Sequence, residues 1–354
     1  MLVPLEVALG FEPLAEKAAS EHAKYERICS LCTGPIGELA LGRARGQGDA
    51  SRFVTLRPLP LSNFDRIEAT VRQAANIAHP RLTKVLGLAW LDEAPYLASE
   101  YVDGLSAGEL ARELRSAETS VIQEVALRIA LDALSAVSAA RTALRERGLS
   151  ELPRSLYPDT AWIATFGETL LSDVGVAAEL ASLNSAQSDC LWSAPRGRTR
   201  NSAKDDVFAA GALLFELLSG RSLASVRANE AAPVPALDDL PRNGRPIAKQ
   251  LVELVARALA VEPKRRFEDA EQMLQAILAL PSHWIGSEAQ VEAAIETLAH
   301  RATDLRASEP SLELTSGEHE ADELWEIPTR SLRLRLPNED DDRLTLRPEE
   351  TRKL

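Results

Sequence analysis

This chain of 354 residues has few cysteines, no long apolar run and no excess of positive charge. Its three cysteines are too few for a disulfide framework, and no apolar run reaches the roughly 18 residues of a membrane-spanning helix. The start, Met1 to Glu6, has no basic segment ahead of an apolar one, so we expect no signal peptide. The net charge of −13 argues against general nucleic-acid binding, which needs basic surface. We therefore expect a cytoplasmic protein with no membrane span and no nucleic-acid partner.

The negative charge is concentrated at the C-terminal end. Residues 309–354 hold thirteen acidic and seven basic residues, without sustained apolar periodicity. This composition predicts an acidic, disordered tail. Within it, the stretch 331–337 alternates leucine with arginine. Two interpretations of that stretch stay open: a solvated tail, or a docking peptide that adds a strand to the sheet edge of a partner.

Short strand-like runs follow a partly helical lead-in at residues 1–24. They are apolar segments bounded by glycine and aspartate, which favours strands. Five are expected, at residues 27–31, 38–44, 53–59, 83–91 and 95–99. Between the third and the fourth, Phe64, Ile67 and Val71 have the spacing of one helix face, and this helix should end near Ile77, just before His79-Pro80.

Helical patterns fill the chain from Leu105 onward. We expect helices at residues 121–147, 206–219, 247–260 and 269–280, and Ser287-Glu-Ala-Gln290 is a capping box that opens another, to about residue 304. The segment 206–219 is apolar on every side, so it should be buried. No internal repeat with a period of 20–50 residues is present.

A pair of motifs in the middle of the chain is the strongest indication of its fold and function. An apolar run ends in Asp173-Val-Gly175, and Ala194-Pro195 follows nineteen residues after the glycine. Eighteen residues before Asp173 stands Ser155, within Pro-Arg-Ser-Leu-Tyr-Pro-Asp-Thr. This frame resembles that of the eukaryotic-like Ser/Thr protein kinases of bacteria, in which Asp-x-Gly binds metal and His-Arg-Asp-Leu-x-x-x-Asn forms the catalytic loop.

Further landmarks stand in the order that this family would give them. They are a glycine-rich segment with Gly34 and Gly37, the pair His79-Pro80, a hinge at 96–104, the apolar segment 206–221, and Pro263-x-x-Arg266-Phe267. The resemblance covers about residues 25–280. It implies an α+β, bilobal protein-kinase-like fold, with a five-stranded N-lobe at 25–104 and a helical C-lobe at 105–280. A C-terminal helix at 281–308 and the tail at 309–354 would follow.

The catalytic positions of the family hold other residues in this chain. The resemblance places Ser155 at the general base, Thr160 at the second metal ligand and Thr70 at the glutamate of the N-lobe helix. A serine is no base near neutral pH unless another group activates it. Asp173 alone remains as a metal ligand. We expect Asp159, beside Thr160, to point away as a solvated loop residue.

Other positions keep residues that the resemblance assigns to binding or to structure. The candidates for nucleotide contact are Gly34, Gly37, Arg57, Glu100 and Val102. Arg57 replaces a lysine and keeps its positive charge, but its longer, planar guanidinium does not replace a compact ammonium group at a tight phosphate site. The resemblance therefore implies that no cofactor is required, and weak binding of ATP and Mg²⁺ stays open. Asp206 would accept backbone hydrogen bonds of the catalytic loop, and Arg266 would face Arg196, where the family has glutamate.

Cys29 and Cys32 are the one closely spaced cysteine pair. They could be half of a zinc site, a redox pair or a chance spacing. Cys190 is the only other cysteine. Residues three apart on a strand point to opposite faces, which argues against a joint site.

An intact frame around altered catalytic positions predicts a pseudokinase, a catalytically impaired kinase homologue. It would act as a scaffold or allosteric regulator in bacterial signalling, with a protein partner such as an active kinase or one of its substrates. Two alternatives stay open. One is a sensor that binds nucleotide without turnover, and the other is an atypical transfer of a phosphoryl or nucleotidyl group from ATP.

Overall fold

The structure is a computed structural model that describes residues 25–307, apart from 35, 45–51, 63, 118, 147, 149–153, 184–191, 193–201, 227–236 and 238–245. The expected lead-in and tail lie outside the described residues. So do Cys190 and the segment Ala194-Pro195-Arg196, including the predicted approach of Arg196 to Arg266.

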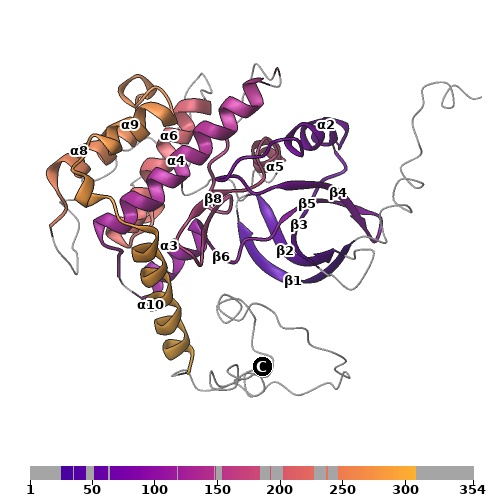
Figure 1. Cartoon of the computed structure of the whole chain (residues 1–354), viewed down its shortest axis with the longest axis horizontal. Helices are drawn as coiled ribbons and strands as arrows, with labels where there is room; N and C mark the ends of the chain where they lie inside the picture. The colour runs from indigo at the N-terminus through magenta and orange to yellow at the C-terminus, as the bar shows by residue number, and fades with distance from the viewer. Residues whose placement is uncertain are drawn as a thin grey trace, which may run out of the picture.

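An antiparallel sheet forms one lobe (Figure 1). Its strands are β1 (Tyr25–Gly34), β2 (Gly37–Ala44), β3 (Arg52–Pro58), β4 (Val85–Leu91) and β5 (Ala94–Glu100), in the order β1-β2-β3-β5-β4. Helix α2 (Phe64–Ala74) buries its apolar face against this sheet, where the ring of Phe64 lies 5.4 Å from that of Trp90. The helix ends three residues before the predicted end, and the side-chain amide of Asn76 donates to the carbonyl of Arg72 at 2.9 Å.

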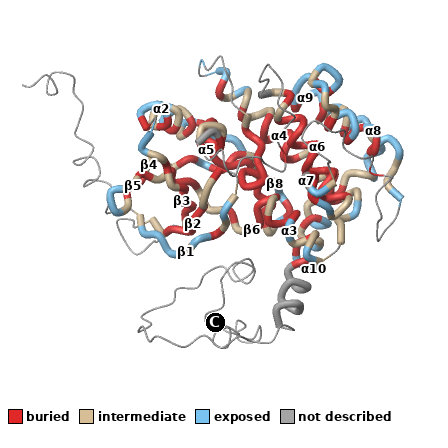
Figure 2. The backbone as a smooth tube through the Cα atoms, turned by 180° about the vertical axis from the view of Figure 1, so that it is seen from behind, coloured by how far each residue is buried: buried red, intermediate tan, exposed pale blue. Residues whose placement is uncertain are grey.

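The second lobe is mainly helical. Its helices are α3 (Ala107–Ser116), α4 (Gln123–Glu146), α5 (Ala177–Leu183), α6 (Ser202–Ser219), α7 (Leu223–Val226), α8 (Lys249–Ala258), α9 (Ala270–Leu278) and α10 (Glu288–Ala307), with single 3₁₀ turns at Pro263–Arg265 and Ser282–Trp284. A small sheet, β6 (Gly104–Ser106), β7 (Ala161–Ala164) and β8 (Thr169–Leu171), lies beside the first lobe (Figure 1). Helix α6 is buried along most of its length (Figure 2), as its all-round apolar sequence predicts.

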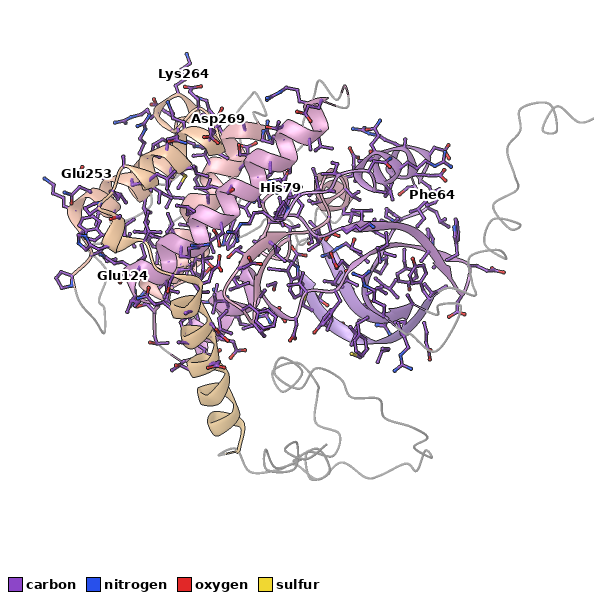
Figure 3. All side chains as sticks on the ribbon, in the orientation of Figure 1. Phe64, His79, Glu124, Glu253, Lys264 and Asp269 are labelled. Carbon is purple, nitrogen blue, oxygen red and sulfur yellow. The ribbon has the colours of Figure 1, made fainter. Side chains whose placement is uncertain are left out.

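Local capping determines where several of these helices begin. The predicted capping box of α10 is present, since Gln290 N–H donates to Ser287 Oγ at 3.3 Å and Ser287 N–H donates to the Gln290 side chain at 2.9 Å. Asp269 caps α9 by accepting from Gln272 N–H at 2.9 Å, and Figure 3 labels it. A second capping box, Ser106 with Glu109, opens α3.

The prediction that Cys29 and Cys32 point to opposite faces of the sheet is wrong. Strand β1 has register shifts between Arg27 and Cys29 and between Ser30 and Cys32. The bulges place Cys29 opposite Leu41 and Cys32 opposite Leu39, two residues apart on β2, so both cysteines lie on one face of the sheet. Neither cysteine forms a disulfide in the part of the chain that the structure describes, and both are half-buried at the edge of an apolar cluster.

The predicted α+β bilobal protein-kinase-like fold is confirmed by this arrangement of a five-stranded antiparallel lobe and a helical lobe. Helix α10 packs on α4, and Arg128 of α4 lies 2.6 Å from Glu288 at the start of α10. Within the described ranges, none of the helices has the length and apolar character needed to cross a membrane.

Candidate functional site

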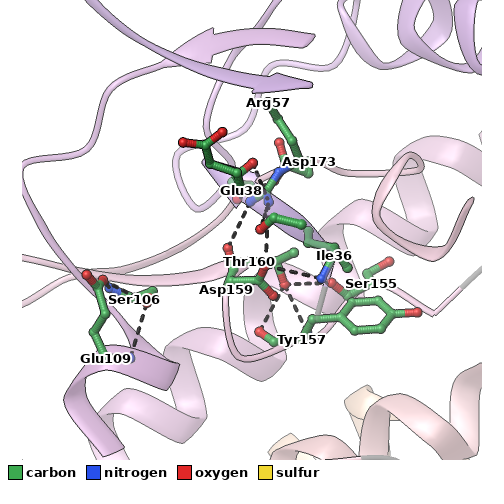
Figure 4. Close-up of polar contacts among 12 residues, drawn as sticks. Ile36, Glu38, Arg57, Ser106, Glu109, Ser155, Tyr157, Asp159, Thr160 and Asp173 are labelled. Atoms are coloured by element: carbon green, nitrogen blue, oxygen red, sulfur yellow. Dashed lines mark hydrogen bonds and ion pairs between the residues drawn. The ribbon is translucent and has the colours of Figure 1, made fainter. Parts of the chain in front are cut away.

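A buried charge cluster of three side chains joins the two lobes (Figure 4). Arg57 on β3 donates from Nε to Oδ2 of Asp173 at 2.9 Å, and both side chains are 1% exposed. Asp173, which follows β8, has a φ of +54°, a left-handed conformation that aspartate tolerates better than most residues. This strained backbone position brings its carboxylate to the guanidinium. The residue predicted as a metal ligand is therefore directly paired with Arg57.

Asp159 is the third member of this cluster, and its prediction as a solvated loop residue is wrong. It is 3% exposed, and its Oδ2 lies 3.5 Å from Nη1 of Arg57. Its backbone carbonyl accepts from Nη2 of Arg57 at 3.4 Å. Residues 158–160 form a turn, in which the neighbouring hydroxyl of Thr160 bonds to Tyr157 N–H and to the carbonyl of Ser155.

Burial and charge act against each other in this cluster. Burial raises the pKa of Asp159 to about 6, although Arg57 opposes the rise. Burial would lower the pKa of Arg57, but Asp173 and Asp159 outweigh it and hold that pKa above its ordinary value. One guanidinium thus faces two carboxylates in a dry environment, and the second carboxylate costs free energy when it is ionised.

The segment with Gly34 and Gly37 closes over the cluster. Ile36 N–H donates to Oδ2 of Asp159 at 3.4 Å, and Nη1 of Arg57 donates to the carbonyl of Gly37 at 3.4 Å. A Cβ on Gly34 would stand 2.6 Å from the Asp159 carboxyl carbon, closer than any side chain allows. Ile36 is 1% exposed and packs with Tyr157 of the catalytic loop. The loop that would contact phosphate in a kinase contacts protein here.

The catalytic-loop positions are occupied by short, buried hydroxyl groups. Ser155 is 1% exposed, and its Oγ has no hydrogen-bond partner among the described residues. The Oγ1 of Thr160 accepts from Tyr157 N–H at 2.9 Å and donates to the carbonyl of Ser155 at 3.0 Å. Thr160 Oγ1 is engaged with backbone groups of its own loop, and the hydroxyl of Ser155 donates to no acceptor among the described residues.

Asp206 accepts hydrogen bonds from the backbone of this loop. Its Oδ1 accepts from the backbone N–H groups of Ser155 and Leu156 at 2.8 and 2.9 Å, and its Oδ2 lies 3.1 Å from Nη1 of Arg141. Burial raises the pKa of Asp206, while the N–H of Leu156 and the charge of Arg141 favour its ionised form. These are the contacts that the kinase resemblance implies for this residue.

Helix α2 supplies no carboxylate to Arg57. Thr70, at the position of the family's glutamate, donates to the carbonyl of Arg66 in its own helix at 3.0 Å. Glu68 pairs with Arg72 at 2.9 Å on the same helix. Helix α5 packs beside α2 (Figures 1 and 2), and its Leu180 shares a buried cluster with the apolar face of α2. Asp173 and Asp159 have thus taken over the pairing that the family assigns to the helix.

The hinge leads to a second apolar cluster. Glu100 makes an ion pair with Arg52 at 2.5 Å, while Val102 is 7% exposed. Val102 packs with Trp162 of β7 and with Leu31, Leu39 and Leu41 from the two strands above. Trp162 could not be identified from the sequence, because a tryptophan in a short apolar strand is ordinary core. Its position between hinge and sheet emerges only from the fold.

Arg266 lies in the C-lobe, away from this cleft. Its guanidinium donates to the carbonyls of Ala260, Lys204 and Val261 at 2.8, 3.2 and 3.2 Å. It also lies 4.9 Å from the centre of the Phe208 ring on α6. These contacts connect the loop after α8 to helix α6 and so stabilise the C-lobe.

ATP with Mg²⁺, the pair that kinase chemistry requires, does not fit these residues as they lie. The Asp159 carboxylate fills the space under Gly34 of the glycine-rich segment. Arg57 is hydrogen-bonded to Oδ2 of Asp173, an oxygen that would bind the metal ion. Among the described residues, no group of three or more His, Cys, Asp or Glu side chains is arranged to hold a metal ion.

Several curated bacterial kinases are similar to this chain. The tyrosine-protein kinase MasK of Myxococcus xanthus is 28% identical over 302 residues, which cover 79% of this chain and 46% of MasK. The serine/threonine-protein kinase PrkC of Bacillus subtilis is 27% identical over 222 residues, 59% of this chain and 32% of PrkC. The chain thus spans less than half the length of these relatives. No protein-family model matches it.

The crystal structure of the PknI kinase domain of Mycobacterium tuberculosis is similar in fold. The two share a TM-score of 0.53 at 23% identity, over 72% of this chain and 94% of the PknI domain. At this identity the likeness shows the fold alone. The chain is therefore similar to bacterial protein kinases over much of its length, and it has the protein-kinase fold.

Proposed function

We propose that this chain is a pseudokinase that serves bacterial signalling as a scaffold or allosteric regulator. The observation that supports it best is the 2.9 Å contact between Arg57 and Asp173, both fully buried. In a kinase the aspartate holds metal and the lysine holds phosphate, and catalysis consists mainly of this positioning. Here the two groups neutralise each other.

The loss of the general base supports the same proposal. A missing general base costs about 10²–10⁴ in rate. Among the described residues, the buried hydroxyl of Ser155 has no hydrogen-bond partner that would accept its proton. With the metal ligand also engaged, protein phosphorylation by this chain would fall to background.

A second candidate is transfer of a different part of ATP, such as the nucleotidyl group. The observation that favours it is the approach of two carboxylates, Asp159 and Asp173, on either side of Arg57. Paired carboxylates hold the metal ions of many phosphate-transfer sites. This candidate requires Arg57 to leave both of them.

Incubation of the full chain with ATP labelled at the γ- or the α-phosphate separates these functions. The assay includes Mg²⁺ or Mn²⁺ and a generic protein substrate, with the Asp173→Asn variant as control. A pseudokinase gives no label above that control with either nucleotide. Label from the γ-phosphate that Asp173→Asn abolishes would refute the proposal, and label from the α-phosphate would establish the second candidate.

The proposed partner is a protein, either an active kinase or one of its substrates. The helical lobe and the segment 309–354 are the proposed contact regions. Deletion of 309–354 tests the second region: binding of a candidate partner should weaken in a pull-down, and unchanged binding would exclude the segment.

A further inference from the structure

Trp162 lies where the base end of a nucleotide would be. Phosphates would lie at Arg57 and the glycine-rich segment, so the base would point to the hinge, between Val102 and the sheet. The indole of Trp162 is 2% exposed in that position, and it packs with Leu31, Leu39 and Val102, which are 8%, 2% and 7% exposed. An indole is a flat bicyclic ring of about the size of adenine, so it can fill the same kind of apolar slot.

Asp159 lies where a phosphate would be. Its carboxylate is an anion below the glycine-rich segment, at 3.4 Å from Ile36 N–H and 3.5 Å from Nη1 of Arg57. Backbone N–H groups and a strand cation are the partners that a kinase offers to phosphate. The close approach of Gly34 to this carboxylate leaves no room for a phosphate between them.

The guanidinium of Arg57, at the lysine position of the family, also takes the place of a metal ion beside Asp173. It supplies positive charge to Oδ2 of Asp173 at 2.9 Å, and the same group reaches Asp159. A cation between phosphate and this aspartate is the arrangement of the metal ion in kinases. The indole, the carboxylate and the guanidinium therefore occupy the places of base, phosphate and metal.

The geometry points to a cleft that is closed by its own side chains, with Trp162, Asp159 and Arg57 substituting for the base, the phosphate and the metal of a bound nucleotide. This inference rests on the proposed function and adds which side chains keep the cleft closed. The two lobes are held in a closed arrangement that does not depend on the nucleotide concentration. Trp162 and Asp159 are the residues that determine nucleotide exclusion.

Calorimetric titration of the full chain with ADP and with ATP, each with Mg²⁺, tests this inference. We expect no saturable binding up to millimolar nucleotide for the natural sequence. The double variant Trp162→Ala, Asp159→Ser removes the indole and the carboxylate, and it should bind ADP with Mg²⁺ at least about tenfold more tightly than the natural sequence. The control is Trp90→Ala, which empties a buried position in the other N-lobe cluster and should give no binding.

Saturable binding of ATP by the natural sequence would overturn the inference. If that binding comes without transfer of label, the pseudokinase proposal still stands, so the two can fail separately. Absence of binding by the folded double variant would also overturn it. If the double variant does not fold, Trp162→Leu keeps the cluster apolar, and adenosine should then raise its melting temperature but not that of the natural sequence; an equal response in both would overturn the inference.

Discussion

Replacement of Asp159 by asparagine should stabilise the protein at neutral pH and not at acidic pH. Burial raises the pKa of Asp159 from 3.8 to about 6 in the folded state. Between these two values the folded state keeps a proton that the unfolded state has released. The contribution of this carboxyl group to stability is therefore greatest below pH 3.8 and is lost as the pH rises through 6. Asparagine has the same shape and never ionises, so it avoids this loss.

The size of the effect follows from the pKa difference. A shift from 3.8 to about 6 corresponds to about 3 kcal/mol of unfolding free energy. The quantity to follow is the unfolding free energy of Asp159→Asn minus that of the natural sequence. We expect it to stay near its low-pH value at pH 4 and to be about 3 kcal/mol larger at pH 7. Most of the change should fall between pH 4 and pH 6.

Urea unfolding of the full chain, followed by circular dichroism at a series of pH values, measures this difference. Glu253→Gln on α8 is the control, because its carboxylate is 65% exposed and pairs with Lys249 at 3.7 Å. An exposed pair contributes about 0–1 kcal/mol, so this control should show little pH dependence. A pH-independent difference for Asp159→Asn, or one that decreases with rising pH, would refute the reasoning about the charge cluster.

Three further predictions concern single contacts around the cleft. Arg57→Met should lower the unfolding free energy by about 3–5 kcal/mol, because it leaves a buried carboxylate unpaired, whereas Arg27→Met at an exposed pair should cost about 0–1 kcal/mol; equal losses in urea unfolding would contradict this. Gly34→Ala should cost about 1–3 kcal/mol alone and clearly less in an Asp159→Ala background, and additive losses in the double-mutant cycle would show that the two residues are not in contact. Asp206→Ala should cost at least about 3 kcal/mol, since it leaves two backbone N–H groups and a cation without their acceptor, and a melting temperature within one degree of the natural sequence would exclude that role.

The fold could be predicted from the sequence because its signals are local and repeated. The apolar spacing of Phe64, Ile67 and Val71 identified α2, and the all-round apolar segment 206–219 identified the buried helix. The ends were less accurate, since α2 stops at Ala74. The capping box Ser106-Ala-Gly-Glu109 was also readable in the sequence, and it would have located the start of α3.

The candidate site was predicted only in part, because its contacts join distant segments. Arg57 and Asp173 were recognised as separate positions, but their pairing spans 116 residues. The direction of the Asp159 side chain depends on the backbone of a tight turn, and the shared face of Cys29 and Cys32 depends on two bulges. Neither feature has a local sequence signal of its own. Trp162 was missed because burial alone does not distinguish core from an occupied binding slot.

Hydrogen–deuterium exchange of the full chain, without nucleotide and with millimolar ATP and Mg²⁺, tests the central claim most directly. The claim is that the cleft is closed by its own side chains. Peptides that cover residues 31–41 and 154–164 should exchange slowly without nucleotide and should not change when ATP and Mg²⁺ are added. Rapid exchange of these peptides that becomes slow on addition of ATP and Mg²⁺ would contradict the account.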